Sequence, residues 1–369
     1  MLHGTGCDKP NNAMHGVGDS STLQTLGLVP FFTQQLADVD LLQARLARVM
    51  AVQRSRVTVL CGAGERIVEL SPALREEAAI DRPTVGDWVL LDESLSRIDR
   101  VLERKTLFRR LGAGVSNELQ PVAANIDTLF IVSSCNEEFK ESRLERYLAL
   151  CADAGATPVI VLTKADMVDD ADSYVRRARK IQAGVAVEAV NALDTTSLDG
   201  VRAWIDNTST IALVGSSGVG KSTIVNTLAG RSLASTGEIR NDDKKGRHTT
   251  THRQLHILPT GGLLIDVPGM RELKVAEIDS SIGAVFDEIE MLAAGCKFSD
   301  CQHDAEPGCA VLRAIEEGNL DSRRLSNYKK LLRENTLATA TLAQKRAQGR
   351  KFAKIVKEVK AIKQEESRN

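Results

Sequence analysis

The sequence predicts a multidomain protein with an N-terminal five-stranded β-barrel of the OB type, a central α/β domain and a mostly helical C-terminal domain that binds zinc. Three patterns predict this architecture. Short apolar segments separated by turns fill residues 46–101, apolar strands alternate with helices after Gln120, and a cysteine–histidine cluster precedes a helical end. A chain of 369 residues, 43% of them hydrophobic, can bury several cores.

Composition restricts the class of protein further. The formal net charge of −1 gives no indication of nucleic acid on its own. No apolar run reaches the length of a membrane span, and residues 1–21 lack the apolar segment of a signal peptide. We therefore expect a cytoplasmic monomer that does not contact a membrane. Residues 1–43 are rich in Gly, Asn and Ser, and we expect them to form a flexible tail.

Residues 44–111 are predicted to form the barrel. Its strands are expected at residues 47–52, 57–61, 66–70, 87–91 and 96–101. Barrels of this size often bind nucleic acid, with RNA as one option, although a barrel without a ligand fits the strands equally well. A local basic patch follows the last strand and consists of Arg104, Lys105, Arg109 and Arg110.

Residues 112–280 are predicted to form a parallel sheet with helices on both faces. Strands are expected at residues 127–133, 158–162, 185–190 and 211–214, with helices at 144–154 and 171–183. The segment after the last of these strands matches the phosphate-binding loop G-x-x-x-x-G-K-[ST] and leads into a helix. Its residues are Gly215, Ser216, Ser217, Gly218, Val219, Gly220, Lys221, Ser222 and Thr223.

The loop has a defined chemistry. Its glycines allow successive backbone N–H groups to point at phosphate oxygens, and the helix N-terminus adds positive potential. Lys221 would contact the β- and γ-phosphates of a nucleotide, and the Ser222 hydroxyl would take one magnesium position.

A base-reading motif lies upstream of this loop. Thr163, Lys164 and Asp166 fit [NT]-K-x-D just past the end of a strand, where parallel-sheet ligand sites lie. The Asp166 carboxylate can accept hydrogen bonds from N1 and the exocyclic amine of guanine, whereas adenine would leave it unpaired. Asn191 and Ala192 follow the next strand, and a backbone N–H there would support the guanine carbonyl.

The order of the two motifs predicts a circularly permuted GTPase domain, since an ordinary GTPase has the phosphate loop first. A sheet can be cut at one surface loop and rejoined at another without a change in its core. Thr250, or Thr249, would close on magnesium and the γ-phosphate, Asp266 would hold magnesium through water, and the Gly269 N–H would sense the γ-phosphate.

Met270 stands where many GTPases have the glutamine that orients the attacking water. Unaided hydrolysis should therefore be slow. His248 is the nearest candidate to place the water, with Lys221 and Thr250 as the other catalytic candidates. An exposed loop histidine, or one that contacts a partner, fits His248 equally well.

Residues 281–335 are predicted to bind zinc. Three thiols and one imidazole, from Cys296, Cys301, His303 and Cys309, fit a closed tetrahedral site, so the metal should be structural. Residues 336–369 are predicted to form a basic helix. From Lys345 onward, nine Lys or Arg residues minus three Glu residues give a net charge of +6, which favours contact with RNA phosphates.

These motifs together resemble the circularly permuted GTPases called ribosome small-subunit-dependent GTPase A. The resemblance runs from about Ala47 to Tyr328. Besides the motifs described above, residues 86–89, 124–127 and 246–251 within this range carry it. It implies a GTPase that binds GTP and GDP, contacts the small ribosomal subunit and its rRNA, and acts late in subunit maturation. By the same resemblance, the subunit stimulates hydrolysis and hydrolysis helps the factor leave.

Three other readings fit parts of the sequence. A P-loop ATPase or kinase would use Lys221 and Ser222 but not Asp166. A non-enzymatic RNA-binding protein would use the nucleotide only to support its fold and would not need His248. A GTPase that acts on another RNA or protein partner would share every motif, and only the family resemblance disfavours it.

Overall fold

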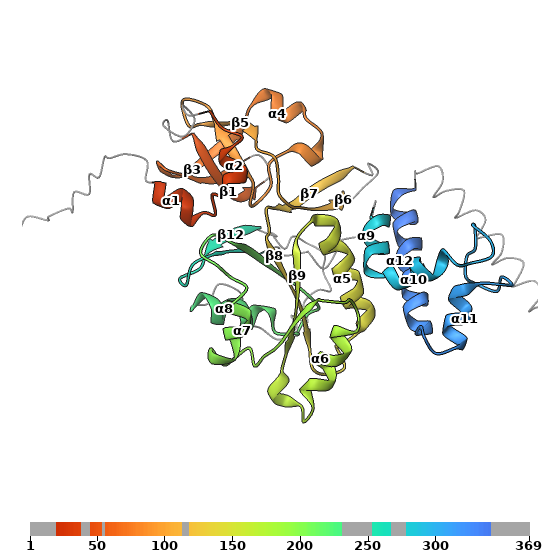
Figure 1. Ribbon diagram of the computed structural model, residues 1–369. Coiled ribbons are helices and arrows are strands. Elements are labelled where there is room, and N and C mark those ends of the chain that lie inside the picture. Colours follow the sequence, from red (N-terminus) through yellow and green to blue (C-terminus); the bar gives the residue numbers. More distant parts are fainter. Residues whose placement is uncertain are drawn as a thin grey trace, which may run out of the picture.

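The computed structural model describes residues 20–37, 45–53, 56–112, 118–230, 253–266 and 278–340. Figure 1 shows a small β-barrel, a central sheet flanked by helices, and a helical C-terminal unit beside helix α5. Among these residues, no helix has the length and apolar composition needed to cross a membrane.

The N-terminal barrel has five strands, as the sequence predicts. They are β1 (Leu46–Gln53), β2 (Arg56–Cys61), β3 (Gly64–Leu70), β4 (Trp88–Leu91) and β5 (Arg97–Val101). Their order is β1-β2-β3-β5-β4, and β4 pairs back with β1 to close the barrel. Val49, Val59 and Ile98 are fully buried in its core. Between β3 and β4 lie α4 (Pro72–Glu76) and the short 3₁₀ helix η1 (Ala79–Asp81).

The expectation of a flexible tail over residues 1–43 is wrong for residues 20–37. This segment forms α1 (Ser20–Thr25) and α2 (Pro30–Thr33). Leu26 and Phe32 are buried, and the Phe32 ring lies 5.8 Å from that of Trp88 in the barrel. The apolar side chains of this segment pack in the same core as Trp88, although the segment follows a polar stretch of the chain. Residues 1–19 and 38–44 lie outside the described part of the chain.

The central sheet contains the four predicted parallel strands and a fifth parallel strand that the sequence analysis did not assign. They are β8 (Thr128–Ser134), β9 (Thr157–Thr163), β10 (Ala186–Ala189), β11 (Thr210–Val214) and β13 (Leu263–Asp266). Their order is β10-β9-β8-β11-β13, and every neighbouring pair is parallel. The phosphate-loop strand β11 therefore lies inside the sheet, although it follows β8, β9 and β10 in the chain.

Helices cover both faces of this sheet. They are α5 (Glu141–Ala154), α6 (Ala171–Arg179), α7 (Asp199–Arg202) and α8 (Lys221–Ala229), with the 3₁₀ helices η2 (Ala165–Met167) and η3 (Thr196–Leu198). Ile131 and Ile160 pack in the same core as α5, whereas their sequence neighbours Val132 and Val161 pack with α8 on the opposite face. This alternation explains why the strands read as continuous apolar runs.

Three further strands were missed by the sequence analysis. A hairpin of β6 (Leu107–Leu111) and β7 (Leu119–Ala124) joins the barrel to the sheet, and β12 (Gln254–Ile257) pairs antiparallel with β13. Strand β12 also pairs with β1, so barrel and sheet form one continuous sheet of eleven strands.

The predicted basic patch after the barrel is largely neutralised within the protein. Three of its four cations form ion pairs: Arg104 with the buried Asp87, Lys105 with Asp127, and Arg109 with Asp153. Sequence spacing alone could not show these pairs, because their partners come from other elements. This patch therefore offers less free positive charge than its sequence suggests.

The C-terminal unit consists of α9 (Asp279–Val285), α10 (Asp287–Ala293), α11 (Ala310–Glu316) and α12 (Ser322–Thr339). Phe286, Ile289 and Leu331 are buried in the core that this unit shares with α5. The boundary predicted at residue 335 falls within α12, because the helix continues to Thr339. The predicted basic segment from Lys345 lies beyond the described residues.

Candidate nucleotide site and metal centre

The predicted nucleotide-binding segments meet at one edge of the central sheet. Strand β9 ends at Thr163, β11 ends where the phosphate loop begins, and β13 ends at Asp266. Asn191 and Ala192 follow β10. Because these strands are parallel, their carboxyl ends lie together, which is where ligands bind in sheets of this type.

The backbone of the phosphate loop is fixed by its glycines. Gly215 has φ +146°, and a Cβ at this position would lie 2.2 Å from the carbonyl oxygen of Val132 in β8. Gly218 and Gly220 also have positive φ values, of +77° and +92°. Helix α8 begins directly after Gly220, so the loop and the helix N-terminus present their N–H groups together.

Two charged side chains border this loop. Lys221 Nζ donates to the carbonyl oxygens of Gly215, at 2.9 Å, and Ser216. The ammonium group thus lies across the loop, where it can meet phosphate oxygens. Burial raises the pKa of Asp266, an effect that the nearby positive charges of His256 and Lys221 oppose.

Thr163 supports the phosphate loop through its hydroxyl group. Its side chain is fully buried, and Oγ1 lies 2.6 Å from the carbonyl oxygen of Val219 and 3.2 Å from that of Ser133. Its Cγ2 would lie 3.4 Å from a Cβ on Gly220. Thr163, the first residue of the predicted base-reading motif, is therefore hydrogen-bonded to the phosphate loop. The sequence analysis did not predict this contact.

The predicted base-reading residues are arranged around two turns. Lys164 has φ +58°, and Asp166 is exposed within η2. The Asn191 carbonyl oxygen Oδ1 accepts from the N–H of Leu193 at 3.0 Å, which shapes the second turn. Thr227 Oγ1 in α8 donates to the carbonyl oxygen of Ala192 at 2.9 Å. The exposed Asp166 carboxylate is free to accept hydrogen bonds from a base edge at this end of the sheet.

Arg143 is a residue of this region that the sequence analysis missed. Its Nη1 donates to Ser216 Oγ in the phosphate loop, 73 residues later in the chain. Glu138 holds the same guanidinium at 3.0 Å, and the hydrogen bond from Arg143 lowers the pKa of that carboxyl. No sequence motif marks this arginine.

Two of the candidate magnesium ligands, Ser222 and Asp266, lie in the described part of the chain. Ser222 in the first turn of α8 and Asp266 at the end of β13 are both half-buried, and their oxygen atoms are of the type that magnesium prefers. The predicted residues His248, Thr249, Thr250 and Gly269 lie outside the described residues, as does Met270.

The four predicted zinc ligands lie together, with all their ligand atoms within 4.8 Å of one another. Cys296 Sγ is 3.8 Å from Cys309 Sγ and 3.6 Å from His303 Nδ1, and His303 Nδ1 is 3.4 Å from Cys309 Sγ. A tetrahedron with Zn–S of about 2.3 Å and Zn–N of about 2.05 Å has edges of about 3.8 Å and 3.6 Å. The donor set therefore fits one zinc ion, with no position left for a substrate.

The surrounding chain holds these ligands in place. Burial, and then the charge of Lys329, lowers the pKa of His303, which favours the neutral imidazole that binds metal. Lys329 Nζ in α12 donates to the His303 carbonyl oxygen at 2.6 Å. The Glu306 carboxylate accepts hydrogen bonds from the backbone N–H groups of Gln302 and Asp304, which shape the loop between the ligands. Backbone hydrogen bonds of this kind lower the pKa of Glu306 to about 2.

Comparison with known proteins agrees with this architecture. The family model described as RsgA GTPase matches residues 101–276, and one described as ABC transporter matches residues 198–366, a range that includes the phosphate loop. "Small ribosomal subunit biogenesis GTPase RsgA 2" of Vibrio parahaemolyticus is 46% identical over 347 residues, which cover 94% of this chain and 95% of that protein. "Small ribosomal subunit biogenesis GTPase RsgA" of Mesorhizobium japonicum is 46% identical over 322 residues, which cover 86% and 90%.

Solved structures show the same fold. YjeQ from Thermotoga maritima is 26% identical, with a TM-score of 0.58 over 79% of this chain and 98% of that one. YloQ, described as a circularly permuted GTPase, has a TM-score of 0.55 at 24% identity, over 78% of this chain and 94% of that one. The permuted arrangement of the central sheet is therefore confirmed.

Proposed function

The chain belongs to the RsgA GTPase family and is a GTP hydrolase, and on this basis we propose that it binds the small ribosomal subunit and acts late in its maturation. The names of the relatives support a role in subunit biogenesis. We further propose that the subunit stimulates hydrolysis and that the protein works in the cytoplasm as a monomer.

One observation carries the assignment of the site. The phosphate loop and the Thr163–Asp166 motif meet at a single sheet edge, although they are reversed in the chain. In the proposed mechanism the loop amides and Lys221 bind the β- and γ-phosphates, while Asp166 reads guanine. Asn191 and Ala192 form the turn beside the base.

Magnesium would be held by Ser222, Thr250 and Asp266, and it would neutralise charge on the phosphates. The Gly269 N–H would contact the γ-phosphate. His248 would place the attacking water, since Met270 has no hydrogen-bonding group for this task. We therefore expect GTP hydrolysis to be slow in the isolated protein and faster with the small ribosomal subunit.

The proposed RNA contacts come from three parts of the chain: the barrel, the metal-binding unit and the basic C-terminal segment. The zinc ion would stabilise the fold of its unit, because its four ligands come from the protein and leave no open position.

The test is GTP hydrolysis with and without purified small ribosomal subunits at fixed salt, with ATP as the control nucleotide. We expect slow hydrolysis of GTP alone, a strong increase with subunits, and no comparable turnover of ATP. His248→Ala should then reduce the stimulated rate with little change in GTP affinity. Tight GTP binding with no response to subunits would refute the proposed partner but leave the GTPase assignment standing.

A further inference from the structure

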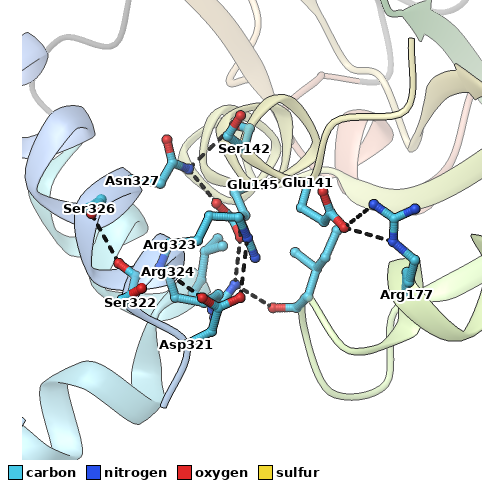
Figure 2. A network of polar contacts seen from close by, with 12 residues as sticks. Glu141, Ser142, Glu145, Arg177, Asp321, Ser322, Arg323, Arg324, Ser326 and Asn327 are labelled. Carbon is cyan, nitrogen blue, oxygen red and sulfur yellow. Dashed lines mark hydrogen bonds and ion pairs between the residues drawn. The ribbon is translucent and has the colours of Figure 1, made fainter. Parts of the chain in front are cut away.

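The first turn of α5 contacts both the nucleotide site and the C-terminal unit. Arg143 and Glu145 are two residues apart, which corresponds to about 200° around a helix, so their side chains leave opposite faces. Arg143 reaches Ser216 in the phosphate loop. Glu145 reaches α12 in the C-terminal unit (Figure 2).

The contact with α12 is built around a buried charge. The Glu145 side chain is 0% exposed, and its carboxylate accepts from Arg323 at 2.9 Å, from Arg324 at 3.1 Å and from Asn327. Asn327 also donates to the backbone carbonyl of Ser142, one position before Arg143. A buried carboxylate with three donors from one helix fixes that helix in a single arrangement.

Arg324 extends this network through the C-terminal unit. Besides Glu145, it donates to the carbonyl oxygen of Val285 at 3.0 Å and to Glu288 at 2.6 Å. Its guanidinium carbon lies 4.6 Å from the ring centroid of Phe286. A displacement of the α5 turn would therefore disturb contacts in α9, α10 and α12 together.

The contact with the loop lies beside the phosphate-binding lysine. Ser216 accepts from Arg143 through its hydroxyl and from Lys221 through its carbonyl. The same Nη1 of Arg143 also donates to the Glu138 carboxylate at 3.0 Å. If phosphate binding moves the Lys221 ammonium group, the hydrogen bond from that group to Ser216 changes. Ser216 is in turn hydrogen-bonded to Arg143 in α5.

We propose that Arg143 is a positioning residue of the nucleotide site and that the first turn of α5 couples the phosphate loop to the C-terminal unit that carries the metal centre. The coupling gives that unit a different stability or orientation with GTP than with GDP. Its meaning for the ribosomal subunit rests on the proposed function, but the coupling itself is a property of the isolated protein.

The test measures hydrogen exchange in α12 of the full-length protein, with GDP and with a non-hydrolysable GTP analogue. In the wild type we expect exchange at residues 320–332 to differ by about fivefold or more between the nucleotides. Arg143→Gln and Ser216→Ala should each remove most of this difference, and the double variant should remove no more than either one alone. Arg143→Lys, which keeps a charged donor, should retain part of it.

The control is Arg177→Gln. Arg177 pairs with Glu141 at the same end of α5 but comes from α6 (Figure 2). This variant should keep the full nucleotide-dependent difference. Thermal unfolding and nucleotide affinity, measured in parallel, separate loss of coupling from loss of fold or of binding. If Arg143→Gln loses nucleotide affinity, Ser216→Ala, which keeps every loop amide, provides the deciding measurement.

A wild-type protein with no nucleotide-dependent exchange in α12, or Arg143 and Ser216 variants that keep the full difference, would overturn the proposal. No ribosomal subunit enters this experiment. Its failure would therefore leave the proposed partner untouched, and a missing subunit response would leave the coupling untouched.

Discussion

Replacing Thr163 with valine tests whether the base-reading motif supports the phosphate loop. Valine has nearly the shape of threonine, so the substitution leaves no large cavity. It removes only the hydroxyl group, which lies 2.6 Å from the carbonyl oxygen of Val219 and 3.2 Å from that of Ser133. The hydroxyl has one hydrogen, so the nearer carbonyl, that of Val219, loses its donor at a site that water does not reach, because Thr163 is fully buried.

Loss of a buried hydrogen-bond donor costs about 1–3 kcal/mol of unfolding free energy. For a domain of this size, each kcal/mol lowers the midpoint of thermal unfolding by about 2–4 °C, so a fall of about 2–12 °C is expected. Affinity for GTP and for GDP should fall together, because the Val219 carbonyl belongs to the loop that we propose to bind the phosphates common to both nucleotides.

Thermal unfolding and equilibrium titration with both nucleotides measure these effects. Thr157→Val is the matched control, since Thr157 is exposed at the opposite end of the same strand. It should leave stability and both affinities unchanged. If the Thr163→Val protein has the same unfolding midpoint and the same nucleotide affinities as the control, the hydrogen bond from Thr163 to Val219 contributes nothing to stability or to nucleotide binding.

Three further predictions concern the same sites. Gly215→Ala places a Cβ 2.2 Å from the Val132 carbonyl oxygen, so it should abolish nucleotide binding in a titration. Gly218→Ala meets no atom within 4 Å and adds only the backbone strain of a φ of +77°, so it should retain the fold with a small loss of stability. Asp166→Asn should weaken GTP binding by on the order of 100-fold or more and leave weak ATP binding unchanged in the same assay; equal effects on both nucleotides would exclude base reading. Metal analysis should find one zinc ion per chain, and Cys309→Ser should remove it and reduce helicity measured by circular dichroism, because Cys309 Sγ also caps α11; full helicity without zinc would contradict a structural role.

Sequence periodicity predicted much of the fold because most strands are buried and apolar. The strands of the barrel and the four predicted parallel strands of the sheet begin and end within two residues of their expected positions. Strand β12 (Gln254–Ile257) was missed because it has only four residues, of which one is buried, so it shows no continuous apolar run. The segment 20–37 was assigned to the tail from its average composition, because the sequence does not show which surface its apolar residues Leu26 and Phe32 pack against.

The candidate site was predictable only where its chemistry lies in consecutive residues. The phosphate loop, the guanine motif and the four metal ligands each have a spacing that one stretch of sequence reveals. The Thr163 hydroxyl and the Arg143 guanidinium act on residues 56 and 73 positions away. Such contacts depend on which strands become neighbours, and a single sequence does not specify these pairs.

The buried carboxylate of Glu145 also has a consequence for the order in which the chain folds during synthesis. Its partners Arg323, Arg324 and Asn327 are translated about 180 residues later. Until they leave the ribosome, the Glu145 carboxylate lacks these donors and stays in water, because its burial without them would be costly. The face of α5 that α12 covers therefore remains exposed until α12 has been made, so a chain interrupted before α12 offers this face to proteases.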